Sequence, residues 1–154
     1  MEKAKKISAV LLAALQIPQI LIWYTILETL KMDSLVIKST ENSYALVFDG
    51  SGFTSALFGR HILPILALAL ILFTSLLLII KRNSTFLPLL CTLASIFLIC
   101  VFAADPQKYQ LAEYTLFRSY LGLPTMYPLK FILLGAEATL FALYGILEIY
   151  KKNR

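Results

Sequence analysis

The chain has 154 residues, of which 59% are hydrophobic and only 15% are charged. Soluble domains are about 45–50% apolar and about 25% charged, so this composition excludes soluble globular, disordered, collagenous and disulfide-rich proteins. It predicts one integral membrane domain over residues 1–154, in contact with the lipid bilayer. We interpret the net charge of +5 as a signal of membrane topology and not of nucleic-acid binding.

Four apolar segments are long enough to cross a bilayer, which takes about 20 residues of helix. We expect transmembrane helices at residues 7–30, 62–80, 86–103 and 129–150. The first segment begins like a signal peptide, but its apolar character continues to Leu30, which favours an uncleaved anchor helix. The polar turn at residues 81–85 is so short that the second and third helices should be antiparallel neighbours.

The first outer loop, residues 31–61, contains two runs rich in β-branched and aromatic residues, at 34–40 and 44–48. A polar break separates the runs, and the sequence Asp49-Gly50-Ser51-Gly52 ends the second one. This pattern predicts a small extracellular β-hairpin. A lone hairpin is barely stable in water, so we expect it to pack on the second outer loop or on another protein.

The second outer loop, residues 104–128, begins with Asp105-Pro106, a favourable start for a helix. Aromatic residues recur after it until Gly122-Leu-Pro124, which ends the segment. We therefore expect a short interfacial helix that anchors in the lipid headgroups, with a partner-binding face as the alternative.

The orientation of the chain follows from its basic residues, which gather on the cytoplasmic side of membrane proteins. One side carries eight basic residues and two acids, whereas the loop side carries six of each. We expect both termini in the cytoplasm (N-in, C-in) and a multi-pass protein of the cell membrane. The eight basic residues are Lys3, Lys5, Lys6, Lys81, Arg82, Lys151, Lys152 and Arg154.

Glu137 is the most informative single residue because it lies inside the fourth apolar segment. A carboxylate at that depth must be paired or protonated and must face the interior of the bundle. Its candidate partners in the first segment are Gln16, Gln19 and Tyr24, with Pro18 freeing a backbone carbonyl nearby. The resulting buried polar cluster could serve as structural hydrogen bonding, as a proton or ion relay, or as a contact for a quinone or other ligand.

Few other residues indicate chemistry. The outer-face candidates are His61, Asp105, Glu113 and Arg118. One histidine cannot form a multi-histidine metal centre, and no nucleotide-binding, hydrolase or metalloprotease motif occurs, so we expect no catalytic residue, metal or cofactor. Cys91 and Cys100 lie about 13 Å apart along one helix and should be buried, unpaired thiols.

Small residues form a stripe at helical spacing in the fourth segment: Gly135, Ala138, Ala142 and Gly145. Such a stripe lets a helix approach closely, and it could seat either the first helix or another subunit.

The order of these elements resembles the claudin-type tetraspan arrangement, with a strand-bearing first outer loop and a tight inner turn between the second and third helices. The resemblance covers the whole chain as topology, and it implies adhesion or partner binding. The claudin signature of tryptophans and cysteines in the first outer loop does not occur in residues 31–61.

Three functions follow as hypotheses. The first is a non-catalytic tetraspan protein that acts as a scaffold, accessory subunit or partner-binding protein through its outer loops, as a homo-oligomer or with another protein. The second is a small subunit of a quinone-linked or proton-coupled complex that uses Glu137, Gln16 and Gln19. The third is a lipid-modifying enzyme that uses His61, Asp105 and Glu113. Cysteine-free loops favour a prokaryotic source.

Overall fold

The computed structural model describes residues 2–40, 43–80, 84–114 and 129–153. Four helical segments in this part are long and apolar enough to cross a membrane, as in a multi-pass membrane protein. They are α1 (Glu2–Asp33), the continuous run of α2 (Gly50–Ala56), η1 (Leu57–His61) and α3 (Ile62–Ile80), α4 (Phe86–Ala104), and α6 (Leu129–Lys152). Two strands and one short helix complete the described elements: β1 (Leu35–Thr40), β2 (Ser43–Phe48) and α5 (Pro106–Tyr114). The prediction of a helical protein with four such helices and a small two-stranded sheet is confirmed.

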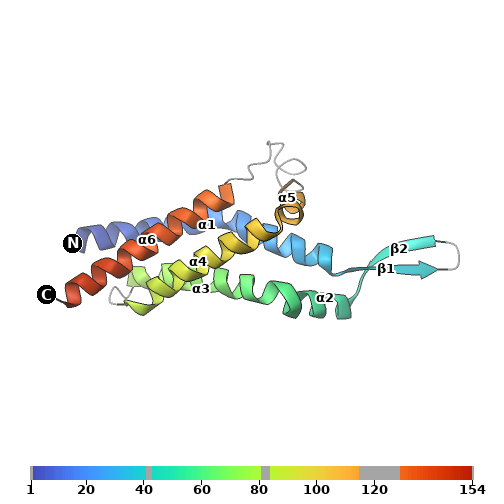
Figure 1. The fold of residues 1–154 in the computed structure, drawn as a ribbon, viewed down its shortest axis with the longest axis horizontal. Coiled ribbons are helices and arrows are strands. Elements are labelled where there is room, and N and C mark those ends of the chain that lie inside the picture. The colour runs from blue at the N-terminus through green and yellow to red at the C-terminus, as the bar shows by residue number, and fades with distance from the viewer. Residues whose placement is uncertain (1, 41–42, 81–83, 115–128, 154) are drawn as a thin grey trace.

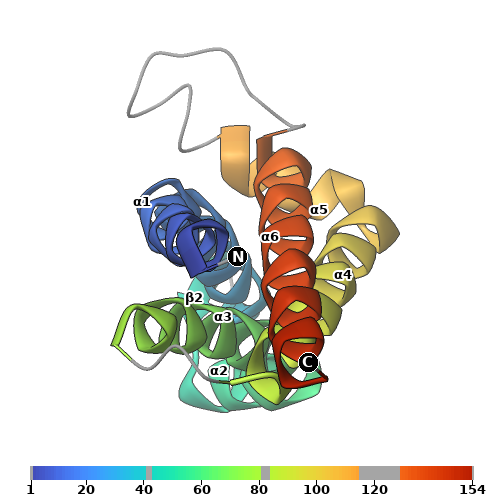
Figure 2. The same cartoon turned by 90° about the vertical axis from the view of Figure 1, so that its left-hand side faces the viewer.

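The long helices form an elongated bundle with the β-hairpin at one end and both chain termini at the other (Figure 1). We call these the hairpin end and the terminal end. Helix α1 packs against α3 and α6, and α4 packs against the same two helices, so the four helices close into a ring (Figure 2). Helices α3 and α4 are neighbours, as expected from the short turn between them.

The interior of the bundle contains polar as well as apolar side chains. Its core includes large apolar side chains such as Leu12, Leu68, Leu98 and Phe141, but it also encloses fully buried polar ones. The buried polar side chains of the helices include Gln19, Thr29, Thr74, Ser75, Ser95 and Glu137. Many large apolar side chains on the outer surface of the same helices are exposed. This arrangement fits a lipid environment, in which polar side chains find hydrogen-bond partners within the protein and not in the surrounding lipid.

The hairpin extends beyond the helices along the long axis of the bundle (Figure 1). Its strands are antiparallel and pair one-to-one from Leu35 opposite Phe48 to Thr40 opposite Ser43, with no bulge. All six residues of β2 are exposed.

Residues 50–61, which we expected to be loop, are helical and continue directly into α3. The sequence after Asp49 not only ends β2 but also starts α2. Asp49 has an extended backbone, and its carbonyl accepts the first helical hydrogen bond, from the Phe53 amide at 2.9 Å. The helix then widens into the π-helical turn η1 before α3. A π turn inserts one extra residue and changes the direction in which later side chains point.

Helix α5 is the described part of the expected interfacial helix. It packs against α1 and α4 at the hairpin end of the bundle, so at least one of its faces contacts protein and not lipid headgroups. The expected continuation toward Gly122, with Phe117 and Tyr120, lies outside the described residues, as do residues 81–83 of the expected inner turn.

Candidate functional site

Glu137 lies in the middle of α6, has no exposed surface and accepts two hydrogen bonds from α1. The amide nitrogen of Gln19 lies 3.0 Å from its Oε2 atom, and that of Gln16 lies 3.3 Å from Oε1. The two glutamines are three residues apart on α1 and therefore lie on the same side of that helix. Sequence reasoning thus placed Glu137, Gln16 and Gln19 together, and the structure brings them into contact.

Ser75 of α3 is a member of this cluster that sequence reasoning missed. Its hydroxyl oxygen lies 3.2 Å from the Gln16 amide nitrogen, and its own proton goes to the carbonyl of Ile71 at 2.7 Å. The signal was present as the Thr74-Ser75 pair in the centre of an otherwise apolar segment. Tyr24, the third expected partner, lies on α1 like the two glutamines. We call Gln16, Gln19, Ser75 and Glu137 the mid-bundle cluster.

The hydrogen-bonding capacity of the mid-bundle cluster is only partly used. The Oε1 atoms of Gln16 and Gln19 are buried and have no hydrogen-bond partner among the described residues. Nor does any Lys, Arg or His of the described part lie within ion-pair distance of Glu137. A buried ionised carboxylate without a counter-charge and buried carbonyl oxygens without donors are both costly.

A second polar cluster lies at the hairpin end, around Asp33, the last residue of α1. His61 of η1 contacts its Oδ2 atom through Nε2 at 2.8 Å, and Lys108 of α5 donates to the same oxygen at 2.5 Å. Three elements distant in sequence therefore meet at one carboxylate. We call Asp33, His61 and Lys108 the hairpin-end cluster.

His61, one of the outer-face candidates, is only 1% exposed. The π turn that ends at His61 directs its ring inward to Asp33, which the sequence did not indicate. Tyr109, expected in a belt of headgroup anchors, is likewise buried and packs edge-on against Phe102 with ring centroids 4.7 Å apart. Burial and, to a lesser degree, the carboxylates of Asp105 and Asp33 raise the pKa of Tyr109, so its phenol stays neutral.

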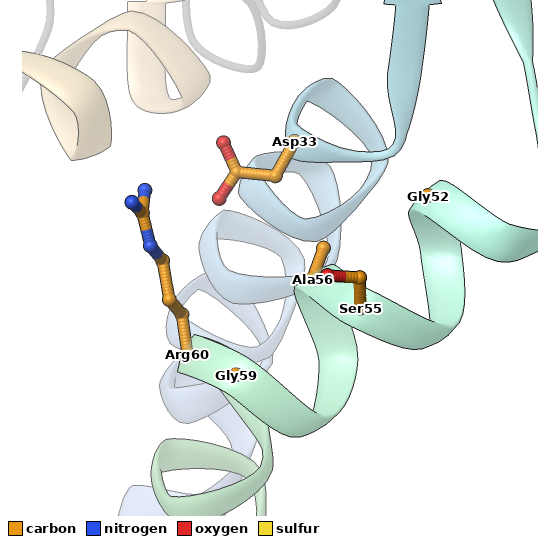
Figure 3. A pocket seen from close by; sticks show the side chains of 6 residues that line it. All are labelled: Asp33, Gly52, Ser55, Ala56, Gly59 and Arg60. Carbon is orange, nitrogen blue, oxygen red and sulfur yellow. The ribbon is translucent and has the colours of Figure 1, made fainter.

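A pocket of about 420 Å³ opens beside the hairpin-end cluster, at the base of the hairpin (Figure 3). Small residues recur along its helical wall, and Asp33 and Arg60 stand on opposite sides of it (Figure 3). The lining residues are Asp33, Gly52, Ser55, Ala56, Gly59 and Arg60. A pocket with both charges and a wall of small residues can accept a polar side chain or a headgroup that carries charge.

The remaining candidates do not form one site. Asp105 is exposed between α4 and α5, the side chain of Glu113 lies outside the described part, and so does all of Arg118. Among the described residues, no group of three or more His, Cys, Asp or Glu side chains is placed to hold a metal ion. Cys91 is buried as expected, but Cys100 is exposed, and both are free thiols.

The small-residue stripe of α6 is partly covered by the chain itself. A side-chain carbon at Gly145 would lie 2.9 Å from Leu89 Cδ2, so this glycine lets α6 approach α4. At Gly135, at the other end of the stripe, no atom of another described residue lies within 4 Å of that position. The part of the stripe at Gly145 thus seats α4, a helix that the sequence had not singled out for this contact.

The hairpin presents an apolar face. Alternate residues of a strand, and residues directly opposite one another, lie on the same face of a sheet. By this rule and the observed register, one face carries Leu35, Tyr44, Leu46 and Phe48 together with one polar residue, Ser39, and we call it the apolar hairpin face. The other face carries Lys38, Ser43, Ala45 and Val47. Phe48 contacts the ring of Phe53 in α2, whereas Tyr44 is 83% and Leu46 67% exposed.

Comparisons of the chain with protein-family models, with curated proteins and with solved structures give no match. Its function must therefore be argued from the sites described above, because a fold class such as a helical bundle hosts many functions.

Proposed function

We propose that this chain is a non-catalytic tetraspan protein of the cell membrane that binds a protein partner through its β-hairpin. The observation that carries the proposal is the exposure of the apolar hairpin face. The hairpin extends past the helix ends (Figure 1). On its apolar face Tyr44 and Leu46 are 83% and 67% exposed. An isolated two-stranded sheet is marginally stable in water and gains stability when such a face is covered.

The partner that fits best is an extended segment of another protein that adds to β2 as a third strand. The sequence of β2, Ser43-Tyr-Ala-Leu-Val-Phe48, has no charge, no proline and no bulge. Natural edge strands usually carry a charge, a proline or a bulge that prevents another strand from pairing with them. Strand β1 has such a charge, Lys38, but β2 has none of these features. Main-chain hydrogen bonds between the partner segment and β2 would supply affinity. Contacts of the partner's apolar side chains with Tyr44 and Leu46 would supply specificity.

A second copy of the chain fits less well, for a reason of symmetry. Two copies in one membrane share their orientation and are related by an axis along the membrane normal. Because the hairpin runs along the long axis of the bundle, this rotation keeps the direction of β2 but turns the apolar face of one copy to the opposite side. The two strands then cannot form one sheet with a common apolar face, which favours a different protein as partner.

The proposal places the hairpin outside the cell and both termini in the cytoplasm. It draws support from Lys3, Lys6 and Lys152, which are exposed at the terminal end of the bundle. Lys5 is different, because it forms a buried ion pair with Glu148 and is largely neutralised there. The pocket at the base of the hairpin gives a partner that covers β2 a second, charged point of contact.

The experiment is site-specific photo-crosslinking in the native membrane. A photoreactive phenylalanine analogue replaces Tyr44, and in parallel it replaces Ala45 on the opposite hairpin face or Ile79 on the apolar surface of α3. We expect one defined protein adduct at position 44, much less at 45, and none with protein at 79. The same adduct should disappear when Leu46→Asp is added, because a buried charge in the interface has no partner.

Three results would contradict the proposal. They are no protein adduct at position 44, an adduct of two 17.3 kDa chains, which identifies a second copy, and adducts with lipid alone. Circular dichroism of the Leu46→Asp variant serves as the control that its helices remain folded.

A further inference from the structure

The pocket at the base of the hairpin has a positive charge on one wall that the described residues do not balance. Asp33, on the other wall, is already paired with the ammonium group of Lys108. Arg60 is exposed, and it forms no ion pair with another residue of the described part (Figure 3). These three side chains together carry one positive charge, and His61, the other neighbour of Asp33, can only add to it. The pocket therefore favours a ligand with negative charge.

The two charged walls also differ in the hydrogen bonds that they offer. The guanidinium group of Arg60 is a planar fork of donors, which binds a phosphate through two parallel hydrogen bonds. The contacts of Asp33 with His61 and Lys108 both use Oδ2, which leaves Oδ1 to accept a hydrogen bond from a hydroxyl group. None of the described lining residues is aromatic, whereas quaternary ammonium groups are typically recognised by aromatic rings. The lining thus suits a phosphate with hydroxyl groups beside it.

The pocket lies at the depth of the lipid headgroups. Residues 7–27 of α1 and 62–80 of α3 contain no charged side chain, and each stretch is close to the about 20 residues that cross the hydrocarbon core. Asp33 and Arg60 lie just beyond these stretches at the hairpin end of the bundle. Charged side chains at the ends of membrane-spanning stretches lie among the headgroups. This depth is the same for either orientation of the chain.

An apolar groove of about 380 Å³ begins about one helical turn beyond the pocket, between α3 and α4. Helix α3 supplies Leu63 and Leu70 to its walls, and α4 supplies Leu93 and Phe97. From Gly52 to Leu70, residues that line the pocket and then the groove recur every three or four positions along the continuous helix. Residues at this spacing lie along one side of a helix. The charged pocket therefore leads into the apolar groove.

We propose that the pocket and the groove together bind one anionic phospholipid. Its phosphate lies on Arg60, a headgroup hydroxyl donates to Asp33, and one acyl chain follows the groove. From Arg60 to Leu70 the helix rises about 15 Å at about 1.5 Å per residue. This rise is half of the hydrocarbon core, which is about 30 Å thick, and so equals the depth of one lipid leaflet. Phosphatidylglycerol has both the single negative charge and the hydroxyl groups that this site selects.

The proposal does not rest on partner binding by the hairpin. Tyr44 and Leu46 line neither the pocket nor the groove, so the apolar hairpin face stays exposed when a lipid is bound. A protein partner on β2 would meet the bound headgroup at the base of the hairpin.

The experiment is native mass spectrometry of the purified chain in detergent. Phosphatidylglycerol or phosphatidylcholine with the same acyl chains is added over a range of concentrations. We expect phosphatidylglycerol to bind with a Kd about tenfold lower, the effect of one charge-assisted contact, and Arg60→Gln to make the two Kd values equal. Lys31→Gln is the matched control, because it removes an exposed positive charge at the same end of the bundle but outside the pocket. This variant should keep the preference. The ratio compares two lipids on the same protein, so a variant that is partly unfolded does not change it.

A second variant tests the groove. Ala94→Leu places a larger side chain in the groove wall and should weaken both lipids to the same degree, while the preference for phosphatidylglycerol remains. Equal Kd values of the two lipids on the unmodified chain, or an undiminished preference in Arg60→Gln, would overturn the proposal. The same loss in Lys31→Gln as in Arg60→Gln would assign the preference to general surface charge and also overturn it. Displacement of the lipid by an equal concentration of glycerol 3-phosphate would identify a free phosphate compound as the ligand instead.

Discussion

Gln19 shows at the residue scale how a polar side chain is accommodated inside a membrane bundle. It is fully buried, and its amide nitrogen is committed to Glu137 on another helix. Such interhelical hydrogen bonds contribute modestly on average, but removing one partner leaves the other without a donor in a place that water does not reach.

We expect Gln19→Leu to lower the free energy of unfolding by about 1–3 kcal/mol, because Glu137 then loses its shorter hydrogen bond while remaining buried. Unfolding in mixed micelles by increasing sodium dodecyl sulfate measures the change. Ile20→Leu, at the adjacent exposed position of α1, is the matched control and should leave the free energy unchanged. Equal effects of the two substitutions would show that the hydrogen bond to Glu137 does not stabilise the bundle.

The contact of Glu137 with Gln16 and Gln19 could be predicted from residue type and spacing. Few other side chains inside the apolar segments could serve as hydrogen-bond partners for a buried acid. Ser75 could not be predicted in this way, since a serine satisfies itself within its own helix and its hydroxyl does so here with Ile71. The burial of His61 could not be predicted either, because the π turn that ends at this residue has no clear signature in sequence.

Helix α5 shows at the element scale what a short polar helix needs in order to dock. It has few apolar residues, and its described attachments are the contact of Lys108 with Asp33 and the packing of Tyr109 on Phe102. The sequence predicted this helix from its start at Asp105-Pro106 but assigned its aromatic residues to the lipid headgroups. Amphipathic spacing does not reveal whether lipid or protein covers the apolar side of a helix.

We expect Asp33→Ala to release α5 from the bundle, because both Lys108 and the buried His61 lose their shared partner. Hydrogen exchange followed by mass spectrometry should show faster exchange in residues 106–114 and at η1, with α4 and α6 unchanged. Gln110→Ala, on the exposed side of α5, should exchange at the rate of the unmodified chain. Uniformly faster exchange throughout the protein would contradict a local role for Asp33.

Gly145 lies where α4 and α6 approach each other closely. We expect Gly145→Leu to lower the free energy of unfolding by about 1–3 kcal/mol, because the new side chain overlaps Leu89 and forces the helices apart. Gly135→Leu provides the matched control on the same helix, since the space beside Gly135 is open. Unfolding in sodium dodecyl sulfate compares the two, and equal costs would refute close packing at Gly145 as the cause.

At the scale of the whole molecule, the two ends of the bundle differ in character. The terminal end joins α1 to α6 through two ion pairs, the buried one of Lys5 with Glu148 and an exposed one of Lys151 with Glu2 at 2.9 Å. The hairpin end carries exposed apolar side chains and an open pocket. One end therefore ties the first helix to the last by ion pairs, and the other carries the hairpin and the pocket at its base.

We expect the terminal end to lie in the cytoplasm and the hairpin outside. Single cysteines at Lys3 or Tyr44, in a chain with Cys91 and Cys100 replaced by alanine, test this with a maleimide that cannot cross membranes. Cysteine at position 44 should be labelled on intact cells, and cysteine at position 3 only after the membrane is permeabilised. The reverse pattern would place the termini outside and remove the proposed setting for the hairpin.

The sequence by itself determined that the chain forms four long apolar helices and a small hairpin, because span length, apolar content and strand alternation are local properties that the bilayer and the backbone enforce. It also determined which polar residues must turn inward, because exposing a carboxyl group such as that of Glu137 to lipid hydrocarbon is energetically costly. Only the tertiary structure decided that α4 packs against Gly145, that α5 attaches through Asp33 and that Ser75 joins Glu137. These contacts depend on the rotation and depth of each helix relative to its neighbours. Packing over the whole bundle sets both quantities, so the sequence of one segment does not predict them.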